Sequence, residues 1–166
     1  MKCLYTTKTE YNYEEFKRYN WTMLIARGKL AQHLLLELVF LIIAIVVPLI
    51  FHRFQGLALI PALYPLIVVV LYVFRVRKAY TASGAPRSMT VNYEFYETEL
   101  VERLDKGTAH YPYAKLQNLV ETKTNVYLLL PGNVSIVLVK KNFPEGLTEF
   151  VRTIIPNGEE MRKLKN

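Results

Sequence analysis

The sequence predicts an α+β membrane protein: a two-helix transmembrane hairpin combined with a small antiparallel sheet that a C-terminal helix closes. Three observations lead to this fold class. Two apolar runs, 34–51 and 57–74, follow each other with an interval of five residues. Residues 89–139 alternate apolar and polar side chains in short stretches between turn residues, as half-buried strands do. An apolar stripe at helical spacing follows between positions 145 and 154.

Residues 1–33 form the first predicted segment, a strand followed by an amphipathic helix. Lys2–Thr9 has weak strand character because it contains threonines, a leucine and a tyrosine. Asn12 is a typical helix N-cap, and Glu15 three positions later completes a capping box. Two interpretations of this helix stay open. It lies in the lipid headgroup layer with Trp21 as an interfacial anchor, or it packs on the cytoplasmic domain.

Residues 34–74 form the predicted hairpin. Each run has 18 residues, so its helix would be about 27 Å long and nearly match a hydrocarbon core of about 30 Å. The tip falls at His52–Gly56. Glu37 is the one acid in the first run, and an acid inside a membrane is a functional candidate by default. Its place near one end favours a structural role. The alternative is a pore-lining role in a transport or channel assembly of oligomerised hairpins.

The distribution of charge predicts the topology. Of the net charge of +7, residues 1–33 supply six Lys or Arg against three Glu, and 75–88 supplies four basic residues without an acid. Residues 89–166 carry ten basic and ten acidic residues and are neutral overall. Because Lys and Arg mark cytoplasmic flanks, we expect a multi-pass protein of the cell (inner or plasma) membrane with both termini cytoplasmic. A neutral folded domain argues against nucleic acid as a partner.

The basic cluster beside the second run is a candidate surface for lipid. Cations next to a bilayer attract anionic phospholipid, and tryptophan favours the interface between membrane and water. The simpler interpretation is that the cluster only directs topology. The candidate lipid contacts are Arg75, Arg77, Lys78 and Trp21.

Residues 75–88 are a basic linker, in which the small residues 81–86 mark the clearest domain boundary. The folded domain is expected over 89–156, ending in a helix over Glu145–Ile154 before Pro156, and 157–166 is a polar tail. Six short antiparallel strands with a capping helix are the outline of a pleckstrin-homology-like (PH-like) barrel. The predicted strands are Met89–Phe95, Leu100–Leu104, Thr108–Tyr113, Asn118–Thr122, Val126–Leu130 and Val134–Val139.

Several short motifs follow the hairpin: Tyr93-Glu-Phe95, Tyr113-Ala-Lys-Leu116, Leu119-Val-Glu-Thr122, Tyr127-Leu-Leu-Leu130 and Lys140-Lys-Asn-Phe143-Pro144. In this order the chain resembles, over nearly its whole length, the YcxB-like family of small bacterial membrane proteins. It departs from the family at Val139-Lys140, where the family tends to have Pro-Lys. The resemblance implies a PH-like C-terminal domain and a membrane location. It implies no established activity and supplies no catalytic residues.

The sequence contains no recognisable catalytic or cofactor-binding pattern. Its three histidines are isolated, its seven glycines are dispersed, and the single Cys3 excludes an internal disulfide. We therefore expect no enzyme, no cofactor and no metal, but a membrane-anchored cytoplasmic module that binds a protein segment or anionic lipid, alone or as a homo-oligomer. An enzyme with an unrecognised site remains a distant alternative. The candidate partner-binding residues are Tyr111, Tyr113, Lys115, Lys140, Lys141 and Phe143.

Overall fold

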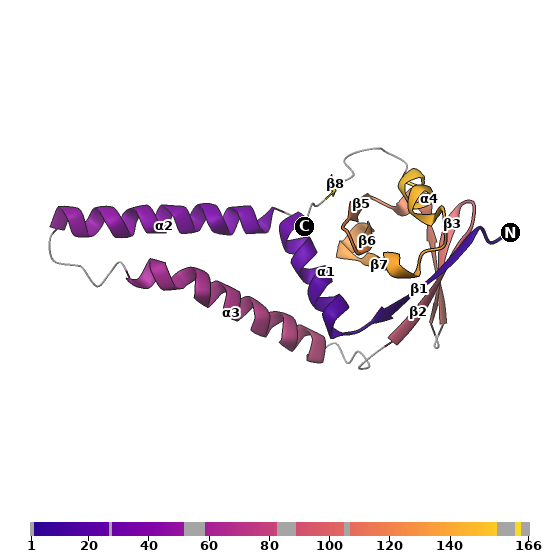
Figure 1. The fold of residues 1–166 in the computed structure, drawn as a ribbon, viewed down its shortest axis with the longest axis horizontal. Coiled ribbons are helices and arrows are strands. Elements are labelled where there is room, and N and C mark those ends of the chain that lie inside the picture. The colour runs from indigo at the N-terminus through magenta and orange to yellow at the C-terminus, as the bar shows by residue number, and fades with distance from the viewer. Residues whose placement is uncertain are drawn as a thin grey trace. The chain divides into compact units, whose positions relative to one another are not determined.

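A computed structural model of the chain describes residues 2–26, 28–51, 59–82, 89–104, 107–155 and 162–163. The chain divides into two compact units (Figure 1). The first, here the β unit, combines Met1–Glu15 with Pro86–Asn166, and the second, the helical unit, is Phe16–Ala85. The expected hairpin tip at 52–56 lies outside the described residues, as do linker residues 83–88 and the tail apart from 162–163.

The first sheet of the β unit has the order β1-β2-β3-β4, and all its neighbours are antiparallel. The N-terminal strand β1 pairs with β2 along its whole length, from Tyr5 opposite Phe95 to Tyr11 opposite Met89. The alternation predicted for β2 is confirmed, because Val91, Tyr93 and Phe95 are buried while their neighbours are more exposed. The strands are β1 (Tyr5–Tyr11), β2 (Met89–Phe95), β3 (Glu99–Leu104) and β4 (Gly107–Pro112).

The second sheet has the order β7-β6-β5-β8, in which only the short β8 runs parallel to its neighbour. Short 3-10 turns connect the strands: Tyr113–Lys115 lies between the two sheets, Pro131–Asn133 joins β6 to β7, and Lys140–Asn142 follows β7. The strands are β5 (Asn118–Glu121), β6 (Asn125–Leu129), β7 (Ser135–Val139) and β8 (Arg162–Lys163), and the helix α4 is Leu147–Thr153.

Helix α4 packs on the core of the β unit. Its Leu147 and Val151 are fully buried with side chains from both sheets, so the apolar face predicted for this helix is confirmed. Phe150 of α4 contacts the ring of Tyr5 at a centroid distance of 5.2 Å and that of Phe95 at 6.1 Å. A short helix such as α4 has little stability of its own, so this packing holds it in place.

Side chains of β1 join the two sheets at the edge strand β7. The Thr9 hydroxyl donates to the Val137 carbonyl at 2.8 Å, and the Val137 amide donates to the Tyr11 hydroxyl at 3.2 Å. The Thr7 hydroxyl extends the seam by donating to the Asn142 carbonyl at 3.0 Å. An edge strand leaves every second backbone amide and carbonyl without a ladder partner. Here, hydroxyl groups of β1 supply such partners to the amide and carbonyl of Val137.

The helical unit contains α2 (Lys29–Phe51), α3 (Leu59–Ala82) and most of α1 (Tyr13–Ala26). The predicted N-cap of α1 is confirmed, since the Glu15 amide donates to Asn12 Oδ1 at 2.9 Å. Helices α2 and α3 run beside each other (Figure 1), with the rings of Phe40 and Tyr64 6.1 Å apart. Gly28, at a φ of +69°, separates α1 from α2 in a conformation that glycine adopts without strain.

The fold-class prediction is wrong in its membrane part. Among the described residues, one helix is long and apolar enough to cross a membrane, α2 with the window Leu30–Val47. In α3 the apolar stretch continues within the same helix into Arg75, Arg77 and Lys78. The protein is therefore a mixed α+β structure with four helices and one candidate apolar helix in its described part, and not a two-helix hairpin membrane protein.

The fold-class prediction is also wrong for the sheet. The strands form two sheets of four rather than one PH-like sheet, and the N-terminal strand is part of the first. Alternation along a strand shows which side chains face the core, but it does not show which strand is the neighbour. In addition, α3 reaches Ala82, so the first half of the expected linker 75–88 is helical.

Candidate functional site

Three of the four predicted lipid contacts gather where α1 meets α3 in the helical unit. Trp21 of α1 lies edge-on against the ring of Tyr72 of α3, with centroids 5.7 Å apart. Arg75 and Lys78 follow Tyr72 on the next two turns of α3, at three-residue intervals that keep their side chains close together. The fourth, Arg77, is exposed on α3 but does not line the same pocket.

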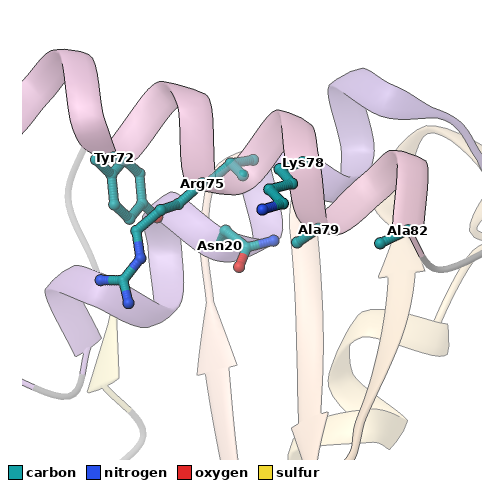
Figure 2. A pocket seen from close by; sticks show the side chains of 7 residues that line it. Asn20, Tyr72, Arg75, Lys78, Ala79 and Ala82 are labelled. Atoms are coloured by element: carbon teal, nitrogen blue, oxygen red, sulfur yellow. The ribbon is translucent and has the colours of Figure 1, made fainter.

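An open pocket of about 460 Å³ lies at this place. Figure 2 shows the side chains of Arg75 and Lys78 extending from α3 on the side where Asn20 of α1 lies. Val76 is buried beneath the pocket, and the small side chains of two alanines leave the space open. The residues that line it are Asn20, Tyr72, Arg75, Val76, Lys78, Ala79 and Ala82. We call this the α1–α3 pocket.

The polar groups of the α1–α3 pocket are mainly donors. Arg75 and Lys78 are exposed, and no carboxylate in the described part of the chain forms a salt bridge with either. Their guanidinium and ammonium groups together offer eight N–H donors and no acceptor. Asn20 is held in place because its Nδ2 donates to the Phe16 carbonyl at 2.8 Å. This arrangement favours an anionic ligand.

Exposed apolar side chains lie directly before the pocket cations on α3 and along α2. Val73 and Phe74, directly before Arg75, are 51% and 66% exposed. Along α2, every large apolar side chain from Leu34 to Val46 is between 41% and 65% exposed. Glu37 lies among them on α2 and is half-buried. Exposed apolar surface of this extent is typical of a site that contacts a membrane or another molecule.

The predicted partner-binding residues do not form one surface of the β unit. Tyr113 is buried in the core, where its hydroxyl donates to the Tyr96 carbonyl at 2.6 Å, so it is not a surface position as expected. Phe143 packs partly buried against the same core. The Tyr111 hydroxyl donates to Glu102 at 2.7 Å, and burial together with this carboxylate raises its pKa to about 12. These side chains stabilise the fold.

The lysines of the β unit that were predicted to bind a partner differ in their exposure and contacts. Lys140 donates to Glu121 at 2.6 Å and belongs to an internal ion cluster, whereas Lys115 and Lys141 are exposed. Arg152 of α4 forms the other half of this cluster with two hydrogen bonds to Glu121, at 2.7 and 3.0 Å. The hydrogen bonds from Arg152, and then those from Lys140, lower the pKa of the Glu121 carboxyl to about 2. The cluster ties α4 to β5.

A second hollow, of about 450 Å³, lies over β1, β2 and the turn after β7. Several of its polar groups already have partners within the fold. Asn142 donates to the Lys8 carbonyl at 2.7 Å, and Glu94 accepts from Arg103 at 2.6 and 3.0 Å. The hydrogen bonds from Arg103 and Tyr96 hold the pKa of Glu94 below its usual range. This hollow offers fewer open donors than the α1–α3 pocket.

Sequence reasoning missed Asn20 and Tyr72 in the α1–α3 pocket. Tyr72, Arg75, Val76 and Ala79 fall at i, i+3, i+4 and i+7, and this helical stripe would have grouped the α3 residues. Asn20 carried no such signal, because its place follows from the contact between two helices. Tyr72 is also the ring on which Trp21 packs, so one residue connects the aromatic anchor with the basic pocket.

Among the described residues, no group of three or more His, Cys, Asp or Glu side chains could hold a metal ion. His110 Nδ1 lies 3.2 Å from Glu99 on the exposed face of β4, and Cys3 is an exposed free thiol. Comparison with known proteins does not extend these observations: no family model matches the chain, and neither a curated protein nor a solved structure matches it.

Proposed function

We propose that this chain is a non-enzymatic binding module that α2 anchors in a membrane. The observation that carries the proposal is the exposure of α2, because only 6% of the window Leu30–Val47 is buried inside the protein. A core helix of a soluble protein would be mostly covered. Lipid provides the missing cover, since each large apolar side chain gains about 1.5–3 kcal/mol when it leaves water. The sum exceeds the cost of about 3 kcal/mol for one acid such as Glu37.

The β unit is expected to stay outside the membrane as one folded body. Because β1 pairs with β2 over its whole length, the strand that precedes the helical unit and the strand that follows it belong to one folded body. A folded body of this kind does not cross a hydrocarbon core. The three cations at the end of α3 favour the cytoplasmic side, following the positive-inside rule. The similarity to YcxB-like proteins, proposed on the motifs of the β unit, agrees with this placement.

Extraction of isolated membranes tests the anchor. The full chain is expected to stay in the membrane fraction after washing with alkaline carbonate. The mass of the intact protein should include α2, which would show that α2 is not removed as a signal sequence. The double variant Leu38→Lys, Ile42→Lys places two cations near the middle of the apolar window, on side chains that are each 52% exposed. Each lysine costs roughly 3 kcal/mol at the centre of a bilayer, so this variant should leave the membrane fraction.

The matched control for this experiment is Gln117→Lys with Thr124→Lys. Both positions are exposed in the β unit, so the control adds the same charge without touching α2. It is expected to remain membrane-bound. Release of the unmodified chain by carbonate, or full retention of the α2 double variant, would contradict the proposed anchor.

A further inference from the structure

We propose that the α1–α3 pocket binds the phosphate-bearing headgroup of an anionic phospholipid. The inference rests on the proposed membrane anchoring, and it names the ligand class for this module. The occupant is a phosphodiester with a net negative charge at the surface of the membrane that receives α2. The pocket thereby gives the protein a preference among lipids in addition to a general affinity for apolar surroundings.

The cations of the pocket are suited to phosphate. The guanidinium group of Arg75 can donate two parallel hydrogen bonds to phosphate oxygens, and the Lys78 ammonium adds a compact charge. The two residues are three positions apart on α3 and both line the pocket, so they are neighbours on the helix surface. No described carboxylate neutralises them, so a ligand does not have to displace an existing ion pair.

The order of side chains along α3 selects a lipid over a free anion. Exposed apolar residues, Val73 and Phe74, come first, and the cations Arg75 and Lys78 follow within one turn. Trp21, which is 42% exposed and packs on Tyr72, lies beside the same turns. A phospholipid molecule carries an acyl chain, a glycerol and a charged headgroup in this order, so one lipid can contact both the apolar residues and the cations. A free phosphate would use only the cations and leave the apolar residues in water.

The single tryptophan allows lipid binding at the pocket to be measured by fluorescence. Trp21 is the only tryptophan of the chain and contacts Tyr72, which lines the pocket. The purified full chain is placed in phosphatidylcholine nanodiscs that contain the same small mole fraction of either brominated phosphatidylglycerol or brominated phosphatidylcholine. Bromine quenches tryptophan fluorescence at short range. The ratio of quenching by the two lipids therefore measures the selection of the headgroup next to Trp21.

We expect the anionic lipid to be enriched beside Trp21 by about tenfold or more, because a hydrogen bond from a pocket cation to the charged phosphate contributes about tenfold. Arg75→Gln and Lys78→Gln should each reduce this ratio by about fivefold or more, because each removes a charged hydrogen-bond donor to the phosphate. Arg77→Gln is the matched control, since it removes one positive charge from the same helix outside the pocket. It should change the ratio by less than about twofold, and all three positions are exposed, so folding should be unaffected.

Three outcomes would overturn the inference. Equal quenching by the two brominated lipids would show that the pocket does not select a headgroup. An effect of Arg77→Gln as large as that of Arg75→Gln would show a diffuse attraction in place of a site. Displacement of the brominated phosphatidylglycerol by millimolar inorganic phosphate would show that a free anion is the ligand. In each case, quenching by lipid still reports membrane insertion, whereas loss of quenching by both lipids would indicate failure of the anchor itself.

Discussion

Replacing Glu121 by glutamine tests how the ion cluster holds α4 on the β unit. The carboxylate is only 8% exposed and accepts hydrogen bonds from Arg152 of α4 and from Lys140 after β7. Glutamine has the same size but lacks the charge, so the core beneath the cluster stays filled. We therefore expect a loss of stability that is electrostatic in origin and localised to β5 and α4.

The magnitude follows from the pKa of Glu121, which these partners lower from 4.5 to about 2. A pKa difference of this size corresponds to roughly 3 kcal/mol of stabilisation. Arg152 and Lys140 are 32% and 22% exposed, so water screens part of the interaction. A loss of about 2 kcal/mol in the local free energy of unfolding is the expected result.

The pH dependence has a definite sign. Because the pKa of Glu121 is lower in the folded protein, its contribution is fully present above about pH 5 and declines as the pH falls towards 2. Protonated glutamic acid resembles glutamine. The difference between wild type and Glu121→Gln should therefore be largest near neutral pH and shrink on acidification.

Hydrogen exchange measured by mass spectrometry on the full chain is the assay. Peptides that cover β5 and α4 report the local opening, and their exchange is corrected for the intrinsic rate at each pH. Glu94→Gln is the control, because Glu94 also pairs with an arginine, but Arg103 is 52% exposed and water competes for the pair. Equal losses in the two variants, or a difference for Glu121→Gln that persists unchanged at pH 3, would refute the reasoning.

Two further pairs of substitutions test the backbone and the contact between the two sheets. Gly146→Ala and Gly132→Ala each place a side chain at positive φ, which costs roughly 1–2 kcal/mol, but only at Gly146 does the new Cβ also approach Tyr5, at 3.2 Å from its hydroxyl. Gly146→Ala should therefore lower the thermal midpoint of the β unit more than Gly132→Ala, and a reversed order would exclude the Tyr5 contact as a cause. Thr9→Val removes the buried hydrogen bond to the Val137 carbonyl and should speed exchange in β7 by an amount equivalent to about 1–2 kcal/mol, while Thr9→Ser keeps the hydroxyl and should retain most of the protection.

The positions of most helices and strands could be predicted because their signals are local. The predicted strand Met89–Phe95 coincides with β2, and the capping pattern at Asn12 places the start of α1. Alternating burial along a strand and the hydrogen bond of a helix cap both arise between residues a few positions apart. The same holds for the apolar face of α4. These elements therefore needed no knowledge of distant parts of the chain.

The candidate site could be predicted only in part. The cations of α3 are visible in the sequence as a cluster, but Asn20 enters the pocket through the contact of α1 with α3. The opposite error occurred in the β unit, where Tyr113 and Lys140 were expected at a binding surface. The type of a polar residue does not show what its polar atom contacts. Here the Tyr113 hydroxyl donates to the Tyr96 carbonyl, and the Lys140 ammonium donates to the Glu121 carboxylate.

The sequence alone determined the approximate positions of most regular elements, the apolar character of α2 and the placement of positive charge on α3. Tertiary structure decided the rest: the division of the strands into two sheets, the pairing of β1 with β2, and the seam in which Thr9 of β1 meets Val137 of β7 across 128 residues of sequence. The physical reason is that strand neighbours and edge partners are chosen by the sum of many weak contacts between distant segments. Local periodicity defines the faces of such segments but leaves their partners open.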